Sequence, residues 1–199
     1  MSRQQRADET RTRIMQVAES CFAKQGYDAT GLTEICEGAG VSKGAFYHHF
    51  ASKQALFLEL LNVWLQRLDA QLETVRAGSE DVSVALLSMA QMVYTIIREQ
   101  QGQLPIMFEF WVKAARDPTV WEAVVAPYRR YRDYFAGMIR SGVESQALHV
   151  DDPDLVAQVL VSLAIGLLLQ GLLDADGADW EDVALRSVGM LLSSIKGDA

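Results

Sequence analysis

Histidine is scarce in this sequence, and its scarcity excludes most catalytic and metal-binding chemistry. The three histidines are His48, His49 and His149, of which only His149 lies near carboxylates in the sequence, at Asp151 and Asp152. We expect no Ser/His/Asp set. His48 and His49 are unattractive as a joint metal site, because adjacent residues of a helix point about 100° apart. We expect no enzyme, no cofactor and no metal.

Several other sequence signals are also missing. There is no strand-like alternation, no internal repeat and no glycine-rich phosphate loop outside the pair Gly38 and Gly40. Residues 1–13 are polar and charged throughout, so we expect no signal peptide. The most apolar run, residues 155–173, is long enough to be considered as a membrane span, but polar residues interrupt it and aspartates flank it. We expect a cytoplasmic protein with no membrane partner.

Only two cysteines occur, Cys21 and Cys36. Cys21 lies in an apolar stretch, and we expect both residues to be reduced, buried thiols. A redox-switch disulfide is the alternative, but no basic group that would lower a thiol pKa is obvious beside either cysteine.

Charge is distributed unevenly along the 199 residues, whose net charge is −8. Residues 1–53 hold seven Lys/Arg and six Asp/Glu, whereas residues 54–199 hold eleven and twenty. The negative charge therefore lies in the second part, and the whole-chain charge misleads about the first. We expect two domains, residues 1–53 and 54–199.

Residues 30–53 have the pattern of a helix-turn-helix. Thr30 or Thr33 is suited to cap a short helix, which ends at Gly40, where a left-handed conformation is available. Ser42 is suited to cap a second short helix over residues 43–50. Two short helices joined by a tight glycine-containing turn form this motif.

The second short helix is suited to a DNA major groove. Ala45, Phe46 and Phe50 can pack inward, which leaves polar and charged side chains and Gly44 outside. A helix N-terminus with free N–H groups also attracts phosphate. The residues expected to contact DNA are Thr33, Ser42, Lys43, Gly44, Ala45, Tyr47, His48, His49 and Lys53.

These residues resemble the amino-terminal signature of TetR/AcrR-type transcriptional regulators. The matching positions are Gly26-Tyr27, Thr30, Ile35, Ala39-Gly40-Val41-Ser42, Gly44, Phe46-Tyr47, His49-Phe50, Lys53 and Leu56, without a gap. Cys36 departs from the usual alanine. The resemblance implies a ligand-responsive regulator, a repressor in the first instance, that binds a palindromic operator as a homodimer and is released by a small effector. It leaves open the effector, the operator, the regulated genes and whether the protein represses or activates.

Helical periodicity continues to the end of the chain and predicts an all-α fold of about nine helices. Outside the motif, the expected helices cover residues 8–25, 53–76, 81–100, 105–117, 119–145, 153–174 and 180–195, with a kink or break before Pro127. Residues 1–8 form a flexible arm that is either a solvated tail or a contact to DNA phosphates. The helix that starts at Lys53 is longer than a three-helix head needs, so we expect it to transmit change between the two domains.

The middle helices are rich in methionine and aromatic residues, for which core packing is the default explanation. Together with the family resemblance, this composition favours a cavity for an apolar or aromatic effector. The residues expected to line it are Trp64, Met89, Met92, Met107, Phe108, Trp111, Trp121 and Tyr128.

The helix over residues 153–174 is apolar nearly all round and needs cover on every side. Either it is a central helix of the monomer, or it forms a two-fold four-helix interface with the helix that follows. We expect the interface, with Leu160, Leu163, Leu167, Leu168, Val188 and Leu191. A helical adaptor that has lost its operator is the rival function, and the intact Ser42-Lys43-Gly44 argues against it.

Overall fold

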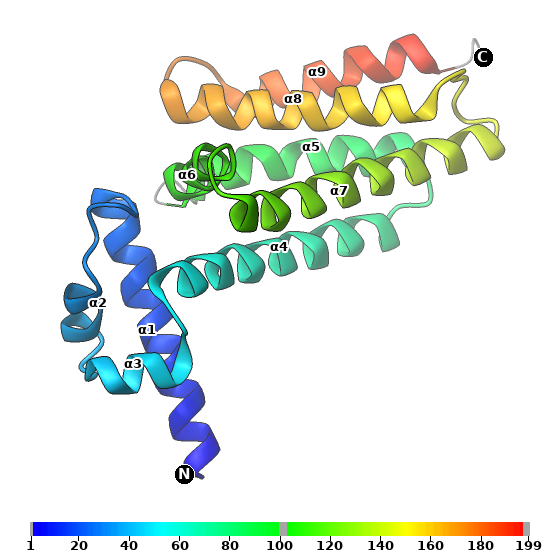
Figure 1. Ribbon diagram of the computed structural model, residues 1–199. Coiled ribbons are helices and arrows are strands. Elements are labelled where there is room, and N and C mark those ends of the chain that lie inside the picture. Colours follow the sequence, from blue (N-terminus) through cyan, green and yellow to red (C-terminus); the bar gives the residue numbers. More distant parts are fainter. Residues whose placement is uncertain (1, 100–102, 197–199) are drawn as a thin grey trace. The chain divides into compact units, whose positions relative to one another are not determined.

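The computed structural model describes residues 2–99 and 103–196, and over this part of the chain it contains α-helices and no strands (Figure 1). The helices are α1 (Arg3–Gln25), α2 (Leu32–Gly38), α3 (Lys43–His49), α4 (Lys53–Ala77), α5 (Val82–Glu99), α6 (Leu104–Ala114), α7 (Pro118–Glu144), α8 (Pro153–Leu173) and α9 (Trp180–Ile195). The expected all-α fold with nine helices is confirmed for the described residues.

One compact unit consists of Met1–Arg67 and Gly102–Ala123. Its core is aromatic: the rings of Phe22 and Phe57 meet edge to face, and Phe110 of α6 stacks on Phe57. All three rings are buried. Burial of each ring contributes about 1.5–3 kcal/mol to stability. This unit therefore contains the three amino-terminal helices, the first part of α4 and the whole of α6.

The second compact unit consists of Leu68–Gln101 and Val124–Ala199. Within it α8 and α9 lie side by side and both contact α5 (Figure 1). The end of α4 is held to α7 by Asp69, whose carboxylate accepts the Arg130 guanidinium at 2.8 Å and the Tyr131 hydroxyl at 2.7 Å. Burial is the main cause that raises the Tyr131 pKa above its ordinary value.

Two helix predictions are corrected. The prediction of a flexible arm over residues 1–8 is wrong, because α1 already begins at Arg3. Ser2 and Gln5 form a reciprocal capping box at its start. Pro127 does not break α7, which is continuous from Pro118 to Glu144. The expected domain boundary after residue 53 stays a prediction about which residues bind DNA. The division by packing is different, because the first compact unit ends at Arg67, inside α4.

Both cysteines are free thiols. Cys36 is buried and Cys21 is half-buried, and burial raises the pKa of each thiol, which lowers its reactivity. Among the described residues, α8 is the one helix long and apolar enough to cross a membrane, which is weak evidence from length and composition alone.

Candidate nucleic-acid interface

The helix-turn-helix unit is formed by α2 and α3. The caps expected at Thr30 and Thr33 are wrong, because Gly31 precedes α2 and no side chain caps it. The Thr30 hydroxyl instead donates to the carbonyl of Gly26 at 2.7 Å, inside the corner between α1 and α2. After α2 the chain turns at Gly40, whose φ of +62° lies in the left-handed region that glycine tolerates.

Helix α3 is fixed at both ends. Ser42 caps it as predicted, with its Oγ accepting the N–H of Ala45 at 3.1 Å. Phe46 is fully buried and Phe50 nearly so, which anchors the inner face. Arg13 of α1 also donates from Nε to the Ala39 carbonyl at 2.7 Å, so the turn between α2 and α3 is tied to α1.

The outer face of α3 is free of intramolecular cover. Thr33, Ser42, Lys43, Gly44, Tyr47 and His48 are exposed, and Ala45 is half-buried. Tyr47 is 55% exposed although it is aromatic, as is common for a side chain that binds a partner molecule. A Cβ built on Gly44 meets no protein atom closer than 3.8 Å, so packing inside the protein does not require glycine there. The outer surface of α3 can therefore approach a flat or grooved partner closely.

His49 differs from His48 because it is half-buried. Burial lowers its pKa, and the neighbouring His48 and Arg11 lower it further, against a small opposing effect of Asp8. Arg11 in turn pairs with Glu59 at 2.8 Å and lies 5.1 Å from the Phe50 ring centroid. His49 is therefore an edge residue of the α3 surface and not its centre.

Lys53 has partners that the sequence did not indicate. Its ammonium donates to the carbonyls of Tyr27 at 2.8 Å and Thr30 at 2.7 Å, and lies 4.3 Å from the Tyr27 ring centroid. Burial lowers its pKa. A phosphate would be an additional partner for this group, so the expected contact with DNA stays a prediction, and Lys53 also has a structural role.

The residues expected to line an effector cavity lie in both units. Trp64, Met107, Phe108, Trp111 and Trp121 belong to the first unit and Met89, Met92 and Tyr128 to the second. Phe108 and Trp111 meet edge to face at 5.0 Å, and Tyr128 accepts a hydrogen bond from Gln158 at 2.7 Å. Met89 is buried and Trp121 is 48% exposed. Their role in effector binding stays a prediction.

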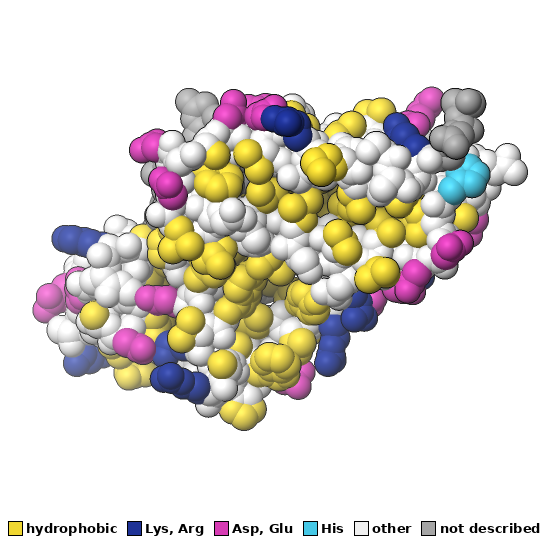
Figure 2. Space-filling model, turned by 90° about the horizontal axis from the view of Figure 1, so that it is seen from above, with side chains coloured by type: hydrophobic (Ala, Val, Ile, Leu, Met, Phe, Trp, Pro, Cys, Tyr) yellow, Lys and Arg dark blue, Asp and Glu magenta, His cyan; other side chains and the backbone are white. Residues whose placement is uncertain are grey.

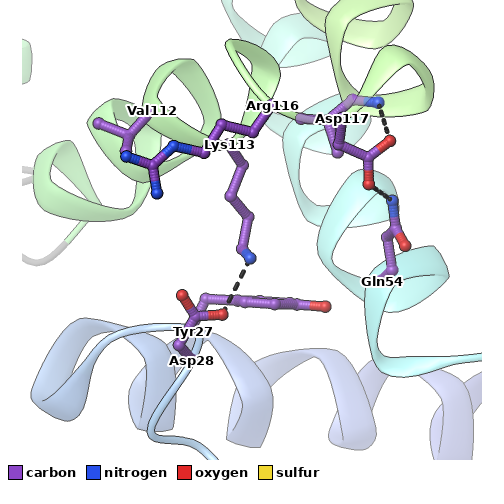
Figure 3. Close-up of a pocket in the computed structure, with 8 residues that line it drawn as sticks. Tyr27, Asp28, Gln54, Val112, Lys113, Arg116 and Asp117 are labelled. Atoms are coloured by element: carbon purple, nitrogen blue, oxygen red, sulfur yellow. Dashed lines mark hydrogen bonds and ion pairs between the residues drawn. The ribbon is translucent and has the colours of Figure 1, made fainter.

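An open pocket of about 180 Å³ lies elsewhere, entirely within the first unit (Figure 3). Its lining contains none of the expected effector residues, and six of its eight residues carry polar or charged groups. The residues are Tyr27, Asp28, Gln54, Val112, Lys113, Arg116, Asp117 and Val120. The sequence pattern had no signal for this group, because its members come from three helices and two loops.

The expected dimer residues divide into two groups. Leu163, Leu168 and Leu191 are partly exposed. Leu160, Leu167 and Val188 are buried inside the second unit, and their place in a dimer interface stays a prediction. Helices α5, α8 and α9 contact one another, and each buries apolar residues in this unit.

A different stripe of α8 is uncovered. Leu155, Val159, Leu169 and Leu173 are exposed, and Ser162 and Gly166 continue the same line at alternating spacings of four and three. Figure 2, which looks onto the face with α8 and α9, shows hydrophobic side chains at that surface. Met190 of α9 is also 73% exposed. This heptad-like spacing is present in the sequence, but it could not be recognised there because leucines also occupy the other faces of α8.

Comparison with known proteins agrees with this geometry. Residues 14–60 match the family model of the bacterial regulatory proteins of the tetR family, and residues 85–193 match the carboxy-terminal model of BetI-type transcriptional repressors. The second match alone covers more than half of the chain.

Individual relatives are distant but extend over most of the chain. The regulator UidR of Escherichia coli K12 is 25% identical over 166 residues, 83% of each protein, and the repressor KstR2 of Mycobacterium tuberculosis is 26% identical over 147 residues, 73% of each. A transcriptional regulator from Saccharomonospora viridis, solved in complex with choline, aligns with a TM-score of 0.84 at 21% identity, over 96% of this chain and all of the other. The solved KstR2, described as a ketosteroid transcriptional regulator, aligns with a TM-score of 0.70 at 22% identity, over 94% and 95% of the two chains.

Proposed function

The chain belongs to the TetR family of bacterial transcriptional regulators, and from that premise we propose that it is a repressor that binds a near-palindromic operator as a homodimer. Its relatives are described as transcriptional regulators and not as enzymes, and one structural neighbour was solved in complex with choline. The observation that carries the proposal is the free outer face of α3, where Lys43, Tyr47 and His48 are exposed behind a helix anchored by Phe46. We also propose that the protein acts in the cytoplasm, where its operator is.

Selection from a random-sequence duplex library tests DNA recognition. The wild-type protein should enrich duplexes with two half-sites about one helical turn apart, because a two-fold protein presents two recognition helices. In filter binding, Lys43→Ala should weaken the complex and lower the salt slope by about one unit. His48→Ala should instead change the preference among sequences. Equal wild-type affinity for the selected and the random duplex would refute a sequence-specific repressor and favour the adaptor reading.

The proposed dimer uses the uncovered stripe of α8 together with α9. Four large apolar side chains in contact with water are unusual on one helix of a monomer, and the small residues Ser162 and Gly166 between them permit close approach of a second helix. A two-fold arrangement would pair this stripe with its copy, which makes a four-helix interface.

Helix α4 is the proposed route from effector to DNA. It is one continuous helix from Lys53, four residues after α3, to Ala77, and its two parts belong to different packing units. An effector that shifts the second unit would act on the far part of this helix. The effector can change DNA affinity only by its differential affinity for the two states, typically 1–3 kcal/mol of coupling.

The effector is proposed to be small and apolar or aromatic. The methionine and aromatic residues of α5, α6 and α7 support this class, and the ketosteroid regulator KstR2 is a relative whose description fits it. Choline, bound to the Saccharomonospora viridis neighbour, represents a cationic alternative. Thermal-shift assays with a ketosteroid and with choline separate the two classes. Calorimetry with and without the selected duplex should then show weaker effector binding in the presence of DNA, since linkage is reciprocal.

A further inference from the structure

The corner between α1 and α2, residues 26–31, is held by hydrogen bonds from several parts of the chain. The Gly26 N–H donates to the Phe22 carbonyl at 2.8 Å, and the Gly26 carbonyl accepts the Thr30 hydroxyl. The carbonyls of Tyr27 and Thr30 accept the Lys53 ammonium. Helix α2 begins directly after the corner, and Lys53 follows α3 by four residues. The hydrogen bond from Lys53 to the Tyr27 carbonyl therefore links the two ends of the helix-turn-helix unit.

Helix α6 supplies the remaining partners of this corner, although it is distant in sequence. Glu109 Oε2 accepts the N–H of Tyr27 at 2.7 Å. One turn further along α6, Lys113 reaches over the Tyr27 ring, with its Nζ 4.3 Å from the centroid, and pairs with Asp28 at 2.9 Å (Figure 3). The hydrogen bond from Lys113 lowers the Asp28 pKa, and the charges of Lys113 and Lys53 lower it further.

Helix α6 is also packed as a member of the same core. Its residues Ile106 and Phe110 are fully buried and Ala114 nearly so, and Phe110 stacks on Phe57 of α4. At the end of α6, Asp117 accepts the Gln54 amide at 2.9 Å. At its start, Gln103 donates to Glu19 of α1. Contacts to α1, to the corner that follows it and to α4 therefore occur from the start of α6 to the loop after it.

We infer that Glu109 is a positioning residue for DNA recognition, and that α6 is a fourth helix of the DNA-binding head. Glu109 holds the main chain at the point where the helix-turn-helix unit starts, and Lys53 holds the point where it ends. This inference rests on the proposed function. It predicts that an effector moves α6 together with the recognition helix and does not slide α6 over a fixed head.

The test compares Glu109→Ala with Glu109→Gln in the full chain, using the duplex that the wild type selects from a random library. The alanine variant leaves the Tyr27 N–H without a partner, and its affinity for the selected duplex should fall about tenfold. Glutamine keeps an acceptor oxygen at the same place, so its affinity should stay within about threefold of wild type. The ratio of affinities for selected and random DNA should fall with the alanine variant, at a temperature where all variants are folded by circular dichroism.

The control is Glu122→Ala, which removes an exposed carboxylate from the same unit away from the corner. Removing a negative charge alone strengthens binding to DNA, so a loss of affinity at Glu109 has the opposite sign to a charge effect. Equal affinities of Glu109→Ala and Glu122→Ala would overturn the inference while the proposed function stands. Failure of the wild type to select any duplex would overturn both.

A second variant decides the question if Glu109→Ala does not fold. Asp28 is highly exposed, with 86% of its side chain accessible, so Asp28→Asn should not disturb folding. Breaking its pair with Lys113 should weaken binding to the selected duplex on the order of threefold, despite the lost negative charge. Unchanged or tighter binding by Asp28→Asn would contradict the role of α6 in positioning the head.

Discussion

The ring of Phe110 in α6 lies on the ring of Phe57 in α4, with centroids 3.7 Å apart and planes inclined by 22°. Phe110 comes from the part of the chain that the sequence assigns to effector binding, yet it completes the core around the recognition motif. Phe110→Ala should therefore lower the free energy of unfolding by about 3–5 kcal/mol. Urea unfolding followed by tryptophan fluorescence and by circular dichroism measures this loss. A change below about 1 kcal/mol would show that α6 is not part of this core.

Gly44 gives a prediction in which stability and DNA binding move in opposite directions. A methyl group at this position meets no protein atom closer than 3.8 Å, and alanine is the better helix former, so Gly44→Ala should raise stability by roughly 0.5–1 kcal/mol. The same methyl occupies the outer face of α3 and should weaken operator binding. Gly137→Ala in α7 is the matched control, because a Cβ there also meets nothing within 4 Å. Its affinity for DNA should equal that of the wild type.

The uncovered stripe of α8 predicts the oligomeric state. Leu169→Glu should leave the fold of the protomer intact, because Leu169 is exposed, but should place an unpaired charge in the proposed interface and produce monomers. Val84→Glu, which alters an exposed apolar residue of α5, should remain dimeric. Sedimentation velocity at micromolar concentration distinguishes these outcomes. A monomeric wild type would remove the basis for the dimer.

His49 predicts a pH dependence of stability. Its pKa in the folded protein is below the ordinary value of 6.5, because burial and the neighbouring cations disfavour its charged form. As the pH falls, His49 is protonated in the unfolded chain before it is protonated in the folded protein. The contribution of neutral His49 to the free energy of unfolding is therefore fully present above pH 6.5 and is lost as the pH falls through the folded pKa. His49→Gln should therefore lose less stability than wild type between pH 7.5 and pH 5.5 in urea titrations. Parallel loss in both proteins would assign the acid sensitivity to other groups.

The sequence predicted local structure well, because local structure depends on neighbouring residues. Ser42 as a cap, Gly40 as the turn and Phe46 as the buried anchor are all found in the structure. The cap of α2 was not predictable in this way, since Gly31 occupies the cap position and the Thr30 hydroxyl instead donates to the Gly26 carbonyl. A hydroxyl near a helix start acts as a cap only when its oxygen can accept an N–H of the first helical turn.

Contacts between distant segments were not predictable from periodicity. Glu109 and Lys113 look like ordinary polar residues of an amphipathic helix, and their partners are more than 80 positions away. Likewise, leucines surround both faces of α8, so the pattern did not separate Leu160, which is buried, from Leu155 and Leu169, which are exposed. Helical spacing shows that a face exists, whereas the packing of other helices decides which face is covered.

The contact between Glu109 and the glycine corner also constrains how the sequence can diverge. Gly26 has a φ of +82°, and a Cβ on it would lie 2.6 Å from Oε1 of Glu109. Any other residue at position 26 would therefore need a strained backbone and would displace the Glu109 carboxylate. Gly26 is therefore coupled to Glu109, which lies 83 residues later in the sequence. Substitutions at the two positions should covary among homologues. Residue 109 would then vary together with the DNA-binding head and not with the effector-binding helices.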